Sequence, residues 1–257
     1  MEEVRKVSSI SAVFPAYNDG GTIPSMVLTA LIALKEVTDD FEVIVTNDGS
    51  ADFTRQVLDA LAERFPELHV IHKEKNGGYG AALRSGFSAA TKEWIFYTDG
   101  DGQYNPLELK NLVGALEEGV DIVNGYKIQR HDPLYRKIIG RIYHHIVKLL
   151  FSFKLKDVDC DFRLFRRDIL DTVKLESETG TICLELVKKM QDAGFNVTSV
   201  PENNTELLDV IQAQGINAGC WAPGVLNEMV GNRTSWGLQL IPMETYREWF
   251  EAEIPQD

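Results

Sequence analysis

Residues 94–103 read Trp94-Ile95-Phe96-Tyr97-Thr98-Asp99-Gly100-Asp101-Gly102-Gln103. This is a five-residue apolar run followed directly by acids, glycines and an amide. The run has the length of a buried strand and is too short for a typical helix. In α/β sheets, ligands bind just beyond the carboxyl ends of the strands. The stretch therefore predicts a buried strand that delivers a polar loop to a binding site.

The same alternation extends in both directions along the chain. Short apolar runs occur at residues 10–14, 43–46, 69–72, 94–98, 121–124 and 196–200. Helix-length segments separate the first five at residues 23–37, 52–65, 79–90 and 106–118. Strands that alternate with helices predict an α/β fold with a mostly parallel central sheet and helices on both faces.

Four polar loops follow four of the predicted strands. They span residues 15–19, 47–50, 76–80 and 99–103. The carboxyl ends of parallel strands meet at one edge of a sheet, so we expect these loops to converge there.

The acidic loop has the composition of a divalent-metal site. Asp99, Asp101 and Gln103 supply the hard oxygen ligands that suit Mg²⁺ or Mn²⁺ held together with substrate phosphates. Gly100 and Gly102 let the backbone turn sharply beside a diphosphate. The alternative is an ordinary acidic surface turn, because Asp-Gly pairs are common in turns.

Two further loops offer groups for a nucleotide. Asp48 ends a strand, where its carboxylate can accept hydrogen bonds from a base or ribose; the alternative is a cap for the next helix. The glycine loop at residues 76–80 opens a helix, whose free amides favour an anion. Leu83 stands where a dinucleotide motif needs its third glycine, and the loop lacks a P-loop ending, which disfavours a dehydrogenase or an ATPase.

Together these motifs resemble glycosyltransferase family 2. The likeness covers roughly residues 8–201 and rests on the segments 14–19, 47–54, 76–82, 99–104 and 157–167, in this order and spacing. The branch it most resembles contains the dolichyl-phosphate mannose synthase-like and bacterial polyprenyl-phosphate glycosyltransferases. The resemblance implies a GT-A fold.

The resemblance also implies roles for individual residues. The nucleotide-sugar would contact Pro15, Ala16, Tyr17, Asp19, Asp48, Gly78, Asp99 and Gly100. The metal ligands would be Asp99, Asp101 and Gln103. A basic loop with Lys127, Arg130 and Arg136 would meet the donor and acceptor phosphates, so that these three and Asp101 carry catalysis.

The implied reaction is metal-dependent, inverting transfer of a hexose from a UDP or GDP sugar to a polyprenyl (dolichyl or undecaprenyl) phosphate. A divalent ion stabilises the charge that develops on the leaving diphosphate. One alternative is a soluble glycosyltransferase with a hydroxyl acceptor, which would need a base among Asp159, Asp161 and Glu185. Another is a sugar-nucleotide-binding protein without turnover.

We expect residues 1–201 to form the glycosyltransferase domain. The donor and metal site would lie within residues 8–125 and the acceptor side within residues 126–201. Residues 202–257 form an atypical C-terminal segment. It begins with acids where the resembling proteins carry His or Arg, which weighs against a lipid-phosphate acceptor.

Charge is distributed unevenly along the chain. A net charge of −13 excludes a general nucleic-acid binder, yet residues 127–156 hold eight Lys or Arg against the single acid Asp132. Residues 135–154 have apolar positions at helical spacing between basic ones, which is typical of a helix on an anionic membrane surface. The alternative is an ordinary helix packed on the core.

We expect a cytoplasmic protein that the basic helix can hold peripherally on the cytoplasmic face of a membrane. The sequence has no apolar run of the ~18 to 20 residues that cross a bilayer, and its first residues lack the apolar core of a secretion signal. Its three cysteines are far apart, which fits a reducing compartment.

Overall fold

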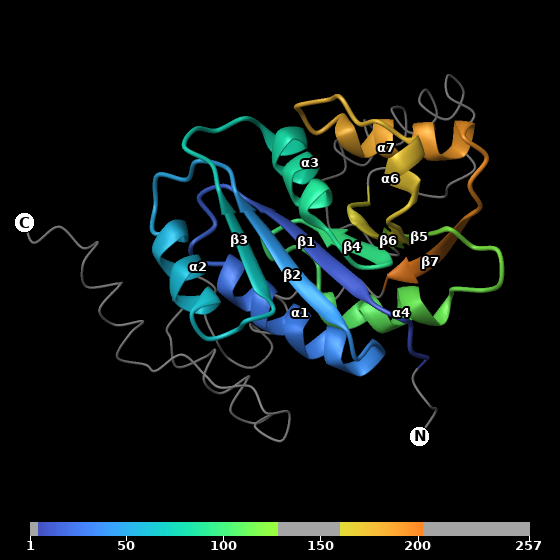
Figure 1. Cartoon of the computed structure of the whole chain (residues 1–257), viewed down its shortest axis with the longest axis horizontal. Helices are drawn as coiled ribbons and strands as arrows, with labels where there is room; N and C mark the ends of the chain where they lie inside the picture. Colours follow the sequence, from blue (N-terminus) through green and yellow to red (C-terminus); the bar gives the residue numbers. More distant parts are fainter. Residues whose placement is uncertain (1–4, 128–159, 203–257) are drawn as a thin grey trace, which may run out of the picture.

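The computed structural model describes residues 5–127 and 160–202; residues 1–4, 128–159 and 203–257 lie outside this description. The described residues form a seven-stranded sheet with helices on both faces (Figure 1). The fold class predicted from the sequence is confirmed. The elements in chain order are β1 (Ile10–Ala16), α1 (Ile23–Val37), β2 (Phe41–Asn47), α2 (Thr54–Ala62), β3 (Leu68–His72), α3 (Tyr79–Ala89), β4 (Trp94–Thr98), the 3₁₀ helix η1 (Pro106–Glu108), α4 (Leu109–Gly114), β5 (Ile122–Lys127), β6 (Phe162–Arg166), α6 (Ile169–Thr172), α7 (Ile182–Asp192) and β7 (Val197–Glu202).

The sheet has the strand order β3-β2-β1-β4-β6-β5-β7. Neighbouring strands are parallel except that β6 runs antiparallel to both β4 and β5. The register pairs Thr98, the last residue of β4, with Phe162, the first residue of β6. The chain therefore enters β6 at the edge of the sheet where β4 and β5 end.

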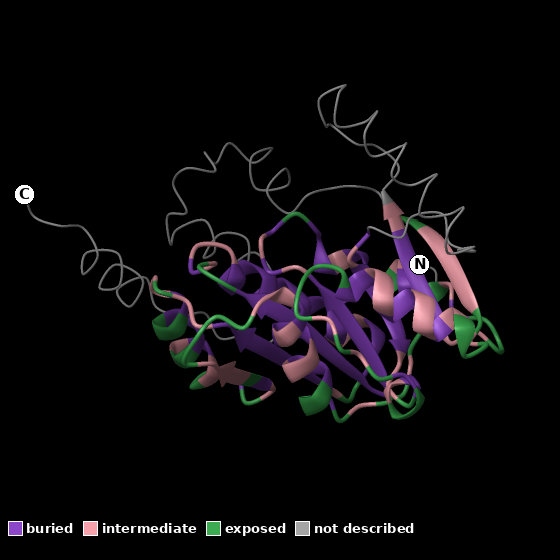
Figure 2. Ribbon diagram, turned by 90° about the horizontal axis from the view of Figure 1, so that it is seen from above, coloured by how far each residue is buried: buried purple, intermediate pink, exposed green. Residues whose placement is uncertain are grey.

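Side-chain alternation along the strands divides the core into two layers. On one face, Phe14 and Val45 pack with α1, α2 and α4. On the other face, Val13 and Ile44 pack with α3, α6 and α7. Both faces are covered, so β1, β2, β4 and β6 form the buried centre of the molecule, whereas the edge strands β3 and β7 are mostly intermediate or exposed (Figure 2).

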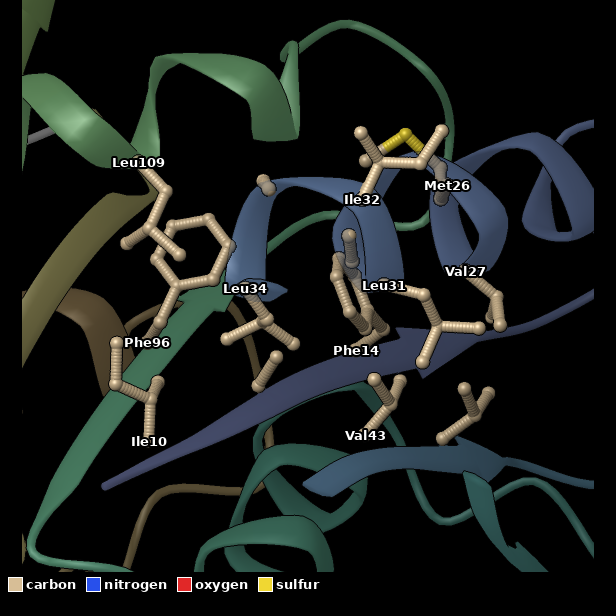
Figure 3. Packing of buried hydrophobic residues seen from close by; sticks show 14 of the residues in the cluster. Ile10, Phe14, Met26, Val27, Leu31, Ile32, Leu34, Val43, Phe96 and Leu109 are labelled. Atoms are coloured by element: carbon tan, nitrogen blue, oxygen red, sulfur yellow. The ribbon is translucent and has the colours of Figure 1, made fainter. Parts of the chain in front are cut away.

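Helix α1 is apolar around almost its whole circumference. It packs against β1 through residues such as Leu31 and Leu34, and its other side is covered by α2, α4 and η1 (Figure 3). Pro24 lies in the first turn, where a missing amide hydrogen costs nothing. Burying a side chain such as Leu31 stabilises the fold by roughly 1.5–3 kcal/mol. This helix fixes the position of the loop that follows β1.

The predicted strands and most predicted helices are confirmed, with four differences. The segment predicted as one helix at 106–118 is a 3₁₀ turn followed by a short helix that ends at Gly114. Asn105 accepts a hydrogen bond from the amide of Leu107 and so starts the tight turn, and glycine is a poor helix former at the other end. The sequence analysis did not predict β6, α6 or α7.

Candidate active site

A cavity of about 400 Å³ lies at the edge of the sheet where β1, β2 and β4 end. These strands are parallel neighbours, so the loops that follow them converge as the sequence predicts. Eight of the predicted site residues line the cavity: Pro15, Ala16, Tyr17, Asp19, Asp48, Asp99, Gly100 and Asp101. Asn76, Tyr79 and Ala82 also line it, although the sequence analysis gave them no role.

The loops after β1 and β2 hold each other in place. The amide of Asn18 donates to Ser50 Oγ at 2.9 Å, and the side-chain oxygen of Asn18 accepts from the amide of Ala51 at 2.8 Å. Asn18 has a φ of 57°, a left-handed conformation that asparagine tolerates better than most residues. This cross-linking fixes Tyr17, which is 49% exposed at the cavity.

Asp48 fills the amide nest of the glycine loop with its own carboxylate. Its two oxygens accept from the amides of Gly77 at 3.1 Å and of Gly78 at 2.8 Å, and Lys73 Nζ lies 3.0 Å from Oδ1. The anion that the sequence places at these amides is therefore, in the structure, a side chain of the protein. Gly78 is not among the residues that line the cavity.

The glycine loop also carries a second close contact, with the loop before α7. A Cβ on Gly78 would lie 2.4 Å from the carbonyl oxygen of Glu178, and one on Gly80 would lie 2.4 Å from that of Ser177. The amide of Gly80 donates to the Glu178 carbonyl at 2.9 Å. Glycine is needed here because two backbone segments meet without room for a side chain.

The acidic loop after β4 is held by contacts with α3 and β1 and by one hydrogen bond within the loop. Asp99 Oδ1 accepts from the hydroxyl of Tyr79 at 2.6 Å, and Asp101 Oδ1 accepts from the amide of Gln103 at 3.0 Å. Gly100 packs against β1, because a Cβ there would lie 2.6 Å from the carbonyl oxygen of Pro15. The Gln103 side chain is exposed, and this residue is not among those that line the cavity.

Negative charge is concentrated at the cavity. Burial raises the pKa of Asp19; the hydrogen bond from the amide of Tyr17 partly offsets this, and the carboxylates of Asp101 and Asp52 raise it further. Carboxylates that repel one another in a partly buried site are stabilised by a divalent cation. No group of three or more His, Cys, Asp or Glu is placed to bind a metal within residues 5–127 and 160–202. The two carboxylates of the predicted set, Asp99 and Asp101, line the cavity and suit a metal that also takes phosphate oxygens from a ligand, whereas Gln103 does not line it.

A buried cation lies behind this acidic loop. Arg163 in β6 is 1% exposed and donates hydrogen bonds to Asn124 Oδ1 and to the hydroxyl of Tyr97, and its Nη1 lies 3.5 Å from Asp161 Oδ1. Burial opposes the charge, but Tyr97 and Asp161 hold the pKa of Arg163 above its ordinary value. The sequence analysis quoted Arg163 only within a family segment and gave it no role.

The basic residues predicted for the acceptor side are placed only in part. Lys127 is the last residue of β5, and its side chain is not described. Arg130, Arg136 and the amphipathic segment at 135–154 lie outside the described residues. Within the described part of the chain, no helix has both the length and the apolar character that a membrane span requires.

Two family models match the chain. The model described as "Glycosyl transferase family 2" matches residues 11–174, and one described as "CobN/Magnesium Chelatase" matches residues 173–257. The second match covers about a third of the chain, and most of it lies outside the described residues.

Curated relatives include two transferases. The undecaprenyl-phosphate 4-deoxy-4-formamido-L-arabinose transferase of Yersinia enterocolitica is 32% identical over 175 residues, which are 67% of this chain and 53% of the relative. The protein of the same name from Photorhabdus laumondii is 32% identical over 182 residues, 70% of this chain and 55% of the relative. The chain thus spans about half the length of these relatives.

Solved structures share the fold. Glucosyl-3-phosphoglycerate synthase from Mycobacterium tuberculosis in complex with phosphoglyceric acid aligns with a TM-score of 0.60 at 19% identity, covering 82% of this chain and 81% of that one. The same enzyme with Mn²⁺, UDP and phosphoglyceric acid gives a TM-score of 0.59 at 19% identity, covering 82% and 80%. Since the first family model matches well over half of the sequence and the sheet agrees with it, the chain belongs to glycosyltransferase family 2 and has the GT-A fold.

Proposed function

We propose that this protein transfers a hexose from a nucleoside diphosphate sugar, UDP-linked or GDP-linked, to a polyprenyl phosphate. The observation that carries the donor side is the cavity of about 400 Å³, which the residues after β1, β2 and β4 line together. Pockets of ~300–1,000 Å³ hold small-molecule ligands and cofactors. A UDP sugar is the first donor to test, because a neighbour of the same fold was solved with UDP.

In this proposal the two sides of the cavity take different parts of the donor. Tyr17, Pro15 and Ala16 offer a partly exposed ring and an apolar surface to the nucleotide. Asp48 also lines the cavity, but its oxygens already hold the glycine loop, so its main effect on the nucleotide is to fix that loop. The acidic pair of Asp99 and Asp101 lies on the side of the diphosphate and the sugar.

Mg²⁺ or Mn²⁺ would be held by Asp101 and Asp99, with Gln103 as a third oxygen ligand. The carboxylate cluster fits this cation, since burial and mutual repulsion already raise the pKa of Asp19 beside it. A bound divalent ion neutralises the charge on the departing nucleoside diphosphate. The chain's own part is to hold these carboxylates at the end of a rigid, fully buried strand.

The proposed acceptor is the phosphate of a polyprenyl lipid, since the two relatives above are named for transfer to undecaprenyl phosphate. A phosphate is already an anion, so its attack on the anomeric carbon needs no strong base, and in-line displacement inverts the configuration. Lys127, Arg130 and Arg136 are proposed to meet the phosphates. Glu185 does not suit the role of a base, because its carboxylate is bound by the amides of residues 176 and 177 and by Lys189.

We further propose that residues 1–201 form the catalytic domain and that the basic stretch brings it to the cytoplasmic face of an anionic membrane. Anionic lipid and the lipid acceptor would then be reached from one surface. The chain's acidic net charge of −13 leaves nucleic acid out of the proposed partners.

A donor panel followed by an acceptor comparison tests the proposal. UDP and GDP sugars are screened by thermal shift with Mg²⁺, Mn²⁺ or EDTA, and the stabilising donor is then offered undecaprenyl phosphate and soluble hydroxyl acceptors. We expect metal-dependent stabilisation by one base and transfer to the lipid phosphate. Transfer only to soluble hydroxyls would replace the acceptor, and binding without transfer or donor hydrolysis would leave a binding protein.

A further inference from the structure

Tyr79 links the glycine loop before α3 with the acidic loop after β4. The sequence analysis gave it no role. It is the first residue of α3 and lines the cavity. Its hydroxyl donates a 2.6 Å hydrogen bond to Asp99 Oδ1, twenty residues further along the chain. Asp99 is one of the two carboxylates to which we assign the metal and the donor.

The backbone on both sides of Tyr79 is held by independent contacts. On the preceding side, the Asp48 carboxylate binds the amides of Gly77 and Gly78. On the following side, Gly80 donates to the carbonyl of Glu178 and leaves no room for a Cβ. The tyrosine ring therefore starts from a fixed backbone, so its hydroxyl is a pre-positioned donor.

The hydrogen bond between Tyr79 and Asp99 has only one possible direction. A phenol hydroxyl donates and a carboxylate oxygen accepts, so Tyr79 is the donor and Asp99 the acceptor. On its other side the hydroxyl is 3.9 Å from Sγ of Cys183 in α7, which donates to it. Asp99 is therefore the last hydrogen-bond acceptor in a series of three side chains that begins at Cys183 in α7 and passes through Tyr79.

We propose that Tyr79 is a positioning residue that orients the carboxylate of Asp99 for the metal-bound diphosphate of the donor. This inference rests on the proposed function. It predicts that the phenol hydroxyl matters for ligands that bring a metal and a diphosphate, and has no effect on ligands that occupy only the nucleoside side. A merely structural hydroxyl would affect both kinds of ligand or neither.

The test compares Tyr79→Phe with Tyr104→Phe. Both remove one hydrogen-bonded phenol hydroxyl and keep the ring. The hydroxyl of Tyr104 accepts from the amide of Asp161 at 3.1 Å, and Tyr104 is not among the residues that line the cavity. Calorimetry measures UDP with Mn²⁺ and, separately, UMP without metal. We expect Tyr79→Phe to weaken UDP–Mn²⁺ binding about tenfold or more, as for a lost hydrogen bond to a charged group, with UMP affinity unchanged. Tyr104→Phe should change neither affinity.

Equal affinity of the wild-type protein and Tyr79→Phe for UDP–Mn²⁺ would overturn the inference and leave the proposed function intact. So would an equal loss for UDP–Mn²⁺ and UMP, which would show a general structural role. If the wild-type protein binds neither UDP nor GDP with either metal, the proposed function itself fails. A ligand-free check is urea unfolding of Tyr79→Phe, Asp99→Ala and the double variant: the losses should not add, and additive losses would contradict the contact.

Discussion

Gly80 and Ser177 approach so closely that a Cβ on Gly80 would lie 2.4 Å from the carbonyl oxygen of Ser177. Gly80 is inside α3, where alanine would ordinarily stabilise the helix by up to ~1 kcal/mol. Because the clash is with backbone, we expect Gly80→Ala to destabilise the protein in urea unfolding. Gly114 is the matched control: it lies in α4 with nothing within 4 Å of its built Cβ, so Gly114→Ala should leave stability equal or higher. Equal effects of the two substitutions would contradict the contact.

Asp48 should be required for stability as well as for binding. Asp48→Asn keeps one oxygen, which at the Oδ2 position can still accept from Gly77 and Gly78, but it puts a nitrogen that cannot accept a hydrogen bond in place of Oδ1 and removes the charge that faces Lys73. We expect the free energy of unfolding to fall by about 1.5–3 kcal/mol and nucleotide affinity to fall with it. The control is Asp39→Asn, whose side chain is 85% exposed. If Asp48→Asn loses affinity at unchanged stability, the carboxylate reads the nucleotide directly.

Asp101 should be required for turnover. Removing its charge takes away a group that we expect to help neutralise the diphosphate, so Asp101→Asn should lose at least about 2 to 3 kcal/mol of transition-state stabilisation. Initial rates with saturating metal measure this loss, with Asp39→Asn as the charge-matched control. Near-normal turnover of Asp101→Asn, or full activity of the wild-type protein in EDTA, would rule out the metal assignment.

Asp19 should make stability depend on pH in a direction opposite to the usual one. Its pKa is raised above the ordinary value of an aspartic acid mainly by burial, so the folded state binds its proton more tightly than the unfolded state does. Its contribution is present at acidic pH and is lost as pH rises through the folded pKa. We therefore expect Asp19→Asn to be more stable than the wild type at pH 7 and to lose this advantage below about pH 4.

Glu42 should make stability depend on pH in the opposite direction and is the comparison for Asp19. Burial would raise the pKa of Glu42, but hydrogen bonds from Ser11 and Thr91 lower it overall. Its stabilising contribution is present above the unfolded pKa and is lost as pH falls. Glu42→Gln should therefore be less stable than the wild type at pH 7, with the difference shrinking in acid. Parallel pH profiles for Asp19→Asn and Glu42→Gln would contradict both assignments.

The basic stretch at residues 127–156 should bind anionic lipid. Each Lys or Arg near such a surface contributes about 1 kcal/mol, screened within a Debye length. We expect the protein to sediment with vesicles containing anionic lipid at low salt and to be released at high salt. Reversing Arg141 and Lys148 to Glu should abolish sedimentation. A wild-type protein that ignores such vesicles would favour the hydroxyl acceptor and a helix packed on the core.

The sequence predicted best those elements and site residues whose position depends on a single physical rule. Buried strands read as apolar runs because both faces of the sheet are covered, and this placed β1, β2, β4 and β5; the edge strands β3 and β7 were found from runs of the same kind although they are only partly buried. The topological rule for parallel sheets then gathered Asp19, Asp48 and Asp99 at one edge. β6 was missed because Arg163 and Arg166 break the apolar pattern, although Arg163 is fully buried. A buried ion network depends on partners from other strands, which no local pattern contains.

The glycine loop shows a second limit of predicting a site from sequence patterns. Consecutive glycines before a helix predict an anion, and an anion is there, but it comes from Asp48 rather than from a ligand. The same glycines are needed for a backbone contact with residues 177–179, about a hundred residues away in sequence. Tyr79 belongs to the same glycine motif, but nothing in the sequence pattern explained a tyrosine there, because its hydrogen-bond partner Asp99 belongs to a different loop.

The reversed direction of β6 has a consequence for how such enzymes can diverge. The chain leaves the sheet at the end of β5 and re-enters at the start of β6, and these two points lie at the same edge as the end of β4, which is followed by the cavity-lining Asp99. We therefore expect that the stretch between them can be exchanged without shifting the register of β5 or β6. A chimera that carries another enzyme's segment between Lys127 and Phe162 should keep its donor and change only what the sugar is delivered to. Donor and acceptor preference would then be inherited as separable parts of one sequence.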